Sequence, residues 1–367
     1  MSLSVTYKHS INYNGNAPGV IIEYLFSNSL SITSSSTAVP AFATPVVFFG
    51  NTAAPPSSVS LSDWMALTEM YEALDDESKS STKTFYLAMR SYFLNGGGRC
   101  YLLKADSGLT AGLARLDDVT LFVQAGQELK DVADLATKLD ALKIFAILDG
   151  PENGLEENAI FPAITNSPDA AAYYPWLKTL DEDIKIAPSP AVAGVYCSND
   201  AQYGPWWTPA NVSLKGVKPA EQVSDIEQAE NISSLNMIRN LYKRPALVWG
   251  GRTQDITDDW KYVSVKRLFN MVERDVRDAL RKIVFHPNTP RTWLSARSAV
   301  TSYLTDIWKR GGLSGNKAGE AFFVNVGRGV TMSDKDIING IMVVEIGIAA
   351  VRPAEFIVLR FSQIMGE

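Results

Sequence analysis

The end of the chain carries two β-forming segments that set the strongest constraint on its fold. Residues 341–348 and 356–361 are rich in valine, isoleucine and other strand-forming residues. Pro353 lies between them and has no backbone N–H to donate, so the first segment must end before it. The second segment stops six residues before the end of the sequence. Because unpaired strands recruit other strands, this segment is expected to join its own sheet or to pair with a neighbouring molecule.

A similar segment lies near the start of the chain. Residues 20–26 read VIIEYLF and follow a polar leader, which we interpret as a mobile arm. We therefore predict an N-terminal arm over residues 1–26 and a C-terminal arm over residues 353–367, each with a strand to donate. The candidate residues of these interface strands are Val20, Ile21, Ile22, Tyr24, Phe26, Phe356, Ile357, Val358, Leu359 and Phe361. A chain with such a strand near each end is better suited to polymerisation than to catalysis.

Between the arms, short apolar runs alternate with segments of helical periodicity. We expect strands at residues 45–50, 100–103, 144–148, 191–197 and 246–249. Helices are expected around residues 64–71, 83–95 and 126–142, the second of them ending at Gly96. Such alternation predicts a mixed or parallel sheet covered by helices, so residues 27–250 are expected to form an α/β domain.

The last third of the chain changes character and predicts an α+β domain over residues 251–352. Residues 260–285 form the clearest predicted helix, because apolar residues recur on one of its faces at helical spacing. Its opposite face carries four basic residues, Lys266, Arg274, Arg277 and Arg281. Such a face is either solvated or able to meet an acidic protein surface. A second helix is expected at residues 291–310, followed by a strand at 321–326.

Composition excludes several classes of function. The chain has 34 basic and 40 acidic residues, a net charge of −6, which argues against a general nucleic-acid binder. Cys100 and Cys197 lie in apolar surroundings and are expected to be buried free thiols. The first fifteen residues do not resemble a secretory signal, and no apolar stretch reaches membrane-spanning length. We therefore expect assembly in the cytoplasm and no direct contact with a membrane.

The sequence offers little for catalysis. The two histidines, His9 and His286, have no obvious partners, and no residue is assigned a catalytic, cofactor-binding or metal-binding role. Residues 250–253, GGRT, follow a predicted strand but lack the Lys-Ser/Thr pair that completes a phosphate-binding loop. Because the two glycines do follow a predicted strand, an α/β enzyme that binds a phosphate-bearing ligand at Gly250–Thr253 stays open as an alternative.

Several short motifs resemble those of contractile tail sheath proteins, the family found in phage tails, R-type bacteriocins and extracellular contractile injection systems. They occur in the family's order over nearly the whole chain, and together they are specific. The motifs are PGVIIE at 18–23, FLNGG and CYLL at 93–103, AGVY at 193–196, WWTPAN at 206–211, VWGGRT at 248–253, VFHPN at 284–288, MSDKDI at 332–337 and PAEFI at 353–357.

This resemblance implies a structural subunit of a helical sheath around an inner tube. On a baseplate signal the sheath contracts and drives the tube through a target envelope, while the terminal arms donate strands to neighbouring subunits. Residues 27–250 are then the middle or outer domain, and residues 251–352 the inner one. The basic residues of the 260–285 helix become candidates for the inner-tube contact.

The implied partners are further copies of the chain or related sheath proteins, an inner tube protein, and baseplate and terminator or cap proteins. The implied location is a virion-like or extracellular particle, released by lysis from the bacterial cytoplasm. The chain is short for a phage member and fits a compact bacteriocin or injection-system sheath. A non-contractile tube or baseplate component of the same particle is the other alternative.

Overall fold

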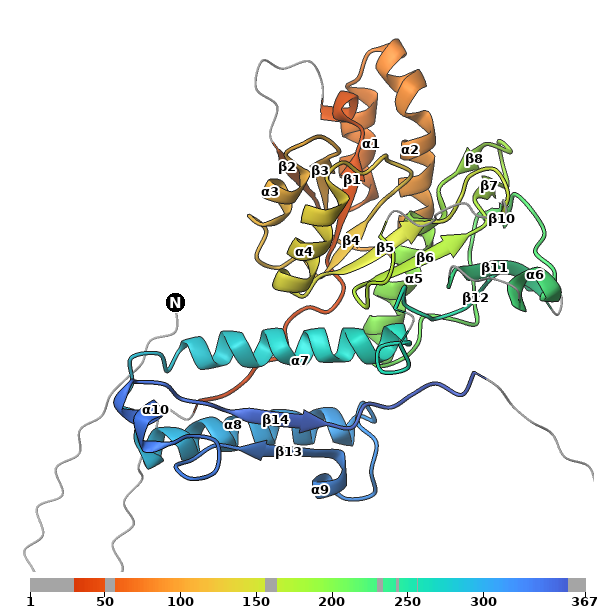
Figure 1. The fold of residues 1–367 in the computed structure, drawn as a ribbon. Helices are drawn as coiled ribbons and strands as arrows, with labels where there is room; N and C mark the ends of the chain where they lie inside the picture. Colours follow the sequence, from red (N-terminus) through yellow and green to blue (C-terminus); the bar gives the residue numbers. More distant parts are fainter. Residues whose placement is uncertain are drawn as a thin grey trace, which may run out of the picture.

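The computed structural model of the protein describes residues 30–49, 57–155, 164–229, 234–241, 244–255 and 257–355. Figure 1 shows two parts, which we call the sheet region (described residues up to 262) and the C-terminal region (residues 263–355). The predicted combination of a helix-covered mixed sheet and a helical C-terminal part is confirmed at this level. The domain boundaries given above stay predictions.

The sheet region is built on a nine-stranded mixed sheet with the strand order β2-β3-β1-β4-β5-β6-β11-β12-β9. The six strands from β3 to β11 in that order run parallel, whereas β2, β12 and β9 pair antiparallel at the two sides. The strands are β1 Pro40–Thr44, β2 Ser58–Leu61, β3 Cys100–Lys104, β4 Leu121–Val123, β5 Phe145–Asp149, β6 Ala170–Tyr174, β9 Val212–Ser213, β11 Asn236–Leu241 and β12 Arg244–Trp249.

Helices cover both faces of this sheet because its strands are apolar on both sides. In β1, Phe42 points into one core and Ala41 and Ala43 into the other, as the two-residue period of a strand requires. The first core is covered by α1 (Trp64–Glu72), α2 (Asp76–Leu94) and α5 (Pro188–Gln202), and the second by α3 (Leu109–Leu113) and α4 (Val132–Leu142). Smaller elements are η1 Val46–Phe49, α6 Asp225–Ala229 and a three-stranded antiparallel sheet of β7 Leu177–Thr179, β8 Lys185–Ile186 and β10 Val217–Pro219.

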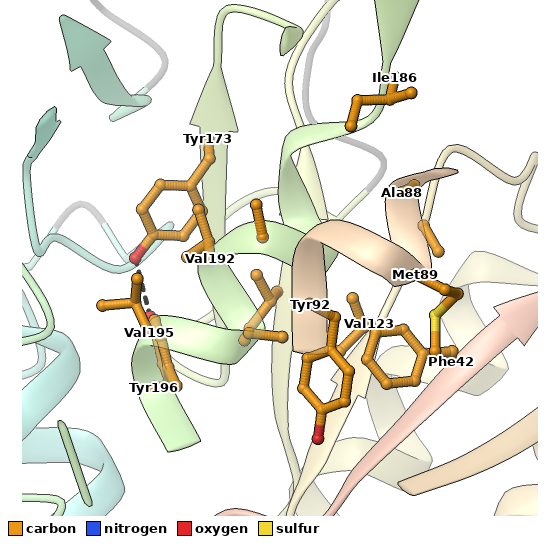
Figure 2. Close-up of a cluster of buried hydrophobic side chains, with 14 of the residues drawn as sticks. Phe42, Ala88, Met89, Tyr92, Val123, Tyr173, Ile186, Val192, Val195 and Tyr196 are labelled. Atoms are coloured by element: carbon orange, nitrogen blue, oxygen red, sulfur yellow. Dashed lines mark hydrogen bonds between the residues drawn. The ribbon is translucent and has the colours of Figure 1, made fainter. Parts of the chain in front are cut away.

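Close packing of α2 against α5 forms the centre of the first core (Figure 2). A side chain at Gly194 would place its Cβ 2.4 Å from the backbone oxygen of Tyr92, so only glycine allows the two helices to approach this closely. Tyr92 contacts Phe42 edge to face, with ring centroids 4.8 Å apart. The hydroxyls of Tyr173 and Tyr196 satisfy each other by a 2.8 Å hydrogen bond within the core. These contacts join the sheet and both helices in one buried cluster.

The C-terminal region packs two long antiparallel helices against a two-stranded antiparallel sheet. The helices contribute Leu268, Val276, Val300 and Leu304 to a third core, and the sheet contributes Val324. A short helix begins at the capping box of Ser333 and Asp336. The elements are α7 Val263–Arg281, α8 Pro290–Lys309, α9 Ala318–Ala321, β13 Phe322–Asn325, α10 Asp334–Ile338 and β14 Glu345–Ile348.

Two predicted strands are wrong. The apolar run expected as a strand at residues 45–50 is not one in its described part, residues 45–49, because the strand is β1, just before them, and Val46–Phe49 form a 3-10 turn. Residues 191–197 belong to α5, which begins with Pro188 and Pro190 in its first turn, where proline favours a helix. Residues 188–196 are buried without a break, so the helical period of α5 is not visible in its hydrophobic pattern.

Candidate assembly surfaces

The two-stranded sheet of β13 and β14 is the least covered sheet in the described part of the chain. Its strands pair in register from Phe322 opposite Ile348 to Asn325 opposite Glu345, and no third strand joins them among the described residues. Ile346 and Ile348 are only partly buried, and Phe323 is 49% exposed. Each of the two strands therefore has a backbone edge that a further strand can pair with.

The predicted interface strands lie outside the described residues. This applies to residues 20–26 and to residues 356–361, so their pairing stays a prediction. The structure does place the root of the C-terminal arm. The chain leaves β14, forms an isolated bridge between Ala350 and Leu313, and reaches Glu355 beside Arg252 of the sheet region.

The four basic residues predicted on α7 lie in very different surroundings. Lys266 is 8% exposed, and its ammonium group lies 3.1 Å from Asp169 of the sheet region. Arg274 donates to the backbone oxygen of Ser36, and Arg277 forms an ion pair with Glu273 one turn away. Arg281 is exposed and pairs with Asp278. The polar side of α7 is therefore largely a contact between the two regions, and Arg281 is the most exposed of the four residues.

Further cations lie on α8, which the sequence analysis did not single out. Arg291, Arg297 and Lys309 are exposed and form no ion pair with any described residue. They belong to a marked charge asymmetry. Residues 263–355 contain 14 basic and 9 acidic residues, a net charge of +5, which leaves −11 on the rest of the chain. A charge count by region is the signal that points to this surface in the sequence.

A buried ion pair joins α7 to the sheet region. The guanidinium of Arg267 binds both carboxylate oxygens of Asp200 on α5, at 2.8 and 2.6 Å, and also donates to the backbone oxygen of Thr37. Both charged side chains are at most 3% exposed. Burial disfavours the charged form of Arg267, but the adjacent Asp200 raises its pKa above the ordinary value. Paired in this way, the two charges are satisfied inside the protein.

A second polar contact lies beside this pair. Asp169 binds the ammonium of Lys266 and accepts a 2.7 Å hydrogen bond from the amide of Asn270. Burial raises the pKa of Asp169, although Lys266 and Asn270 both favour its charged form. Three polar contacts, through Lys266, Arg267 and Asn270, therefore hold the first half of α7 on the sheet region.

The constellation that most resembles an active site lies at the carboxyl end of β5. Asp149 accepts hydrogen bonds from the backbone N–H groups of Gly126 and Ser189 and from the Ser189 hydroxyl. Burial raises the pKa of Asp149 to about 6, against these hydrogen bonds, which favour the carboxylate. Asp149 is 5% exposed and Ser189 is fully buried, so no substrate reaches them. Their role is to join the first turn of α5 to the ends of β4 and β5.

Residues 250–253 form a packed loop. A Cβ at Gly251 would lie 2.2 Å from the Thr208 side chain, and one at Gly250 would lie 2.6 Å from Asn236. The backbone N–H of Arg252 donates to the Asn236 side chain, and that of Thr253 donates to the backbone oxygen of Lys261. With the backbone donors of Arg252 and Thr253 occupied and both glycines in close contact with neighbours, the loop has little space for a phosphate. The geometry speaks against the ligand-binding alternative.

Other signs of chemistry are weak in the described part of the chain. Its acidic, histidine and cysteine side chains form no cluster of three or more suited to a metal ion. Burial raises the pKa of Cys100 and of Cys197, the latter to about 11, which suppresses thiolate reactivity. A groove of about 320 Å³ runs beside residues 34–38, α5 and α7 without a catalytic constellation in its lining. Among the described helices, none has the length and hydrophobicity to cross a membrane.

The chain was compared with known protein families and curated proteins. Residues 255–364 match the family described as the phage tail sheath C-terminal domain. The chain is 25% identical, over 152 residues, to a prophage major tail sheath protein of Pseudomonas aeruginosa strain UCBPP-PA14. This match covers 38% of the chain and 39% of that protein. The chain thus spans well under two thirds of this curated relative.

Among the solved structures that match nearly the entire chain, two illustrate the similarity. One is the sheath complex of an extracellular contractile injection system, PVC, in its contracted state. It has 41% sequence identity, a TM-score of 0.81, and coverage of 96% of this chain and 99% of that chain. The other is the baseplate of the anti-feeding prophage (AFP), with 35% identity, a TM-score of 0.76, and coverage of 96% of this chain and 100% of that chain.

Proposed function

Because this chain belongs to the contractile tail sheath family, a structural and non-enzymatic family, we propose that it polymerises helically around an inner tube and contracts to drive that tube through a target envelope. The observation that carries the proposal is the 41% identity, over 96% of the chain, with the contracted sheath complex. The particle to which this chain is proposed to belong is an extracellular contractile injection system or a related phage-tail-like particle. Its proposed partners are further sheath subunits, an inner tube, a baseplate and a cap.

Polymerisation proceeds by strand exchange in this proposal. The sheet of β13 and β14 has free backbone edges, and the two arms supply apolar strand-forming segments that can pair with them. Residues 20–26 and 356–361 of one subunit would pair with this sheet in neighbouring subunits. Ile346 and Ile348, which are only partly buried in the single chain, would then gain cover from the donated strands.

The inner tube is proposed to lie against the C-terminal region. That region has a net charge of +5 in a chain of net charge −6, so it fits a partner with an acidic surface. The exposed cations on α7 and α8 proposed for this contact include Arg281, Arg291, Arg297 and Lys309. Surface charge pairs are individually weak, which suits a contact that contraction must break.

Contraction is proposed to need no nucleotide. Residues 250–253 are packed and offer no phosphate site. The free energy for contraction would instead be stored in the metastable packing of the subunits during assembly. Extended particles supplied with ATP alone should keep their length in electron micrographs. ATP-driven shortening of purified particles would overturn this part of the proposal.

Deleting residues 356–367 tests the proposal directly. The full-length protein should form wide hollow cylinders in electron micrographs, whereas the truncated protein should stay monomeric and keep its far-ultraviolet circular dichroism and melting temperature. Deletion of residues 1–15, which removes polar sequence and leaves residues 20–26 in place, is the matched control and should assemble. Thin tubes or discs from the full-length protein would instead identify a tube or baseplate component. Normal assembly after the C-terminal deletion would refute strand donation by this arm.

A further inference from the structure

The root of the C-terminal arm is held by an ion pair between the two regions. Glu355 accepts from both sides of the Arg252 guanidinium, with Nε–Oε1 and Nη2–Oε2 distances of 2.7 and 2.9 Å. The Tyr262 hydroxyl, at the start of α7, lies 3.4 Å from the same carboxylate and donates to it. A two-point contact of this kind fixes the direction of the carboxylate as well as its position. Glu355 is thus oriented by groups from the loop at 250–253 and from the start of α7.

Arg252 is itself placed on a rigid base. The Asn236 side chain accepts from the backbone N–H of Arg252 and donates to its backbone oxygen, both at 2.8 Å. Arg252 also forms an isolated antiparallel bridge with Tyr262, and Thr253 beside it is fully buried. The close packing of Gly250 and Gly251 leaves the loop no room to shift. The backbone of Arg252 is therefore held by contacts that do not involve the C-terminal arm.

The arm reaches this point over a short exposed span. Its last backbone contact with the C-terminal region is near Ala350, where Ser314 donates to the backbone oxygen of Ala349 at 2.7 Å. Val351 and Arg352 are exposed, Pro353 restricts the backbone, and Glu355 then meets Arg252. Only one residue separates Glu355 from Ile357 in the proposed donor strand. A contact at Glu355 therefore lies directly beside the first residue of the proposed donor segment.

We propose that the Arg252–Glu355 pair, supported by Tyr262, is a clamp that sets the direction in which the donor strand leaves the subunit. This inference rests on the proposed function, because the clamp has a role in assembly only if residues 356–361 are donated to a neighbouring subunit. Arg252 and Glu355 are positioning residues: they restrict the free arm to the orientations that reach a neighbour's sheet. Restricting the arm in advance lowers the entropic cost of each strand exchange and so favours assembly.

The first test compares assembly of full-length variants by sedimentation across a range of concentrations. Arg252→Ala should raise the concentration at half-assembly by about fivefold, since fewer subunits hold the arm in the competent direction. The reversed pair, Arg252→Glu with Glu355→Arg, should restore most of this loss. Arg90→Ala, which removes an ion pair with Asp181 of similar exposure, is the matched control and should assemble like the unmodified protein. Unchanged assembly of Arg252→Ala would overturn the clamp.

The second test measures arm direction at concentrations below assembly. Spin labels are attached at Lys309→Cys and Val358→Cys, while burial protects Cys100 and half-burial with a raised pKa disfavours labelling of Cys197. The distance distribution between the labels should be narrow in the parent protein and broader after Arg252→Ala. A merely stabilising ion pair would change the melting temperature and leave this distribution unaltered, which would refute the clamp.

The two proposals fail in different ways. If the protein still assembles after deletion of residues 356–367, strand donation by this arm is wrong, whatever Arg252→Ala does. If that deletion abolishes assembly and Arg252→Ala has no effect on assembly or on the spin-label distances, the arm donates a strand without a clamp. Loss of assembly in Arg252→Ala that the reversed pair does not restore would also count against the clamp.

Discussion

The sheet region and the C-terminal region differ in the size of their sheets and in how far those sheets are covered. The nine-stranded sheet ends in short antiparallel strands, β2 with four residues and β9 with two, and helices cover both of its faces. Short edge strands are a common protection against unwanted pairing. In the C-terminal region, β13 and β14 have only each other as partners among the described residues. Because β13 and β14 are also only four residues long, what distinguishes the C-terminal region is its two-stranded sheet with partly exposed side chains.

Charge separates the two regions in the same sense. The C-terminal region is basic and the rest of the chain is acidic, although each carries enough of both charges to form ion pairs. Exposed apolar side chains are also frequent in the C-terminal region, where Phe285 is fully exposed and Ile338 is 84% exposed. Both features are typical of a surface that meets partners. The comparison teaches that stability and assembly are assigned to different parts of one chain.

The comparison depends most on the contact between the two regions. Removing Arg267 should weaken that contact more than any other change considered. Arg267→Met leaves the buried carboxylate of Asp200 without a partner, so the unfolding free energy should fall by about 3–5 kcal/mol. Urea unfolding of dilute protein measures this loss, and separate transitions for the two regions are expected to appear. Asp200→Asn in the same molecule should recover part of the loss. A change below about 1 kcal/mol, as for an exposed pair, would contradict the assigned role.

A pH titration sharpens the view of the sheet region as a self-contained core. Because burial raises the pKa of Asp149 to about 6, its stabilising contribution is complete below the unfolded pKa near 4 and is lost as the pH rises through 6. A rise of the pKa from near 4 in the unfolded chain to about 6 in the folded protein corresponds to roughly 3 kcal/mol of unfolding free energy between pH 4 and pH 7. Thermal unfolding should show this fall in the parent protein relative to Asp149→Asn. Parallel pH profiles of the two proteins would refute it.

The smallest expected effect concerns the exposed corner between α7 and α8. Phe285 has a φ of 69°, in the left-handed region, and its ring has no contact that compensates for this backbone conformation. Phe285→Gly should raise the unfolding free energy by up to about 1 kcal/mol, because glycine adopts such a φ without steric cost. The melting temperature of dilute protein measures this gain. A clear loss of stability would mean that the ring packs within its own subunit.

Sequence reasoning succeeded where a signal is local. The end of α2 before Gly96 and the apolar side of α7 are both found where the pattern predicts. It failed for α5, whose unbroken burial hides the helical period, and for β1, which lies just before the apolar run expected to form it. The resemblance of ordered motifs identified the family, and comparison with solved sheath structures supports it.

The candidate surfaces were only partly accessible to such reasoning. The strand-forming arms follow from composition alone, since valine and isoleucine favour strands wherever the chain later pairs. The basic face of α7 was visible in the sequence, but its burial against Asp169 was not, because that carboxylate lies on a loop about a hundred residues earlier. Residues 250–253 were considered as a phosphate site, whereas the structure shows Arg252 in an ion pair. The ion pair that explains Arg252 needs Glu355, which is 103 residues away.

The amino-acid sequence by itself determined most of the strands and helices, the end of α2 and how charge divides along the chain. These properties depend on neighbours within a few residues. Only the tertiary structure decided which charged groups are buried and paired, and which remain on the surface for partners. The physical reason is that the solvation of a charge is set by everything packed around it, and for Lys266, Arg267 and Arg252 those groups come from distant parts of the chain.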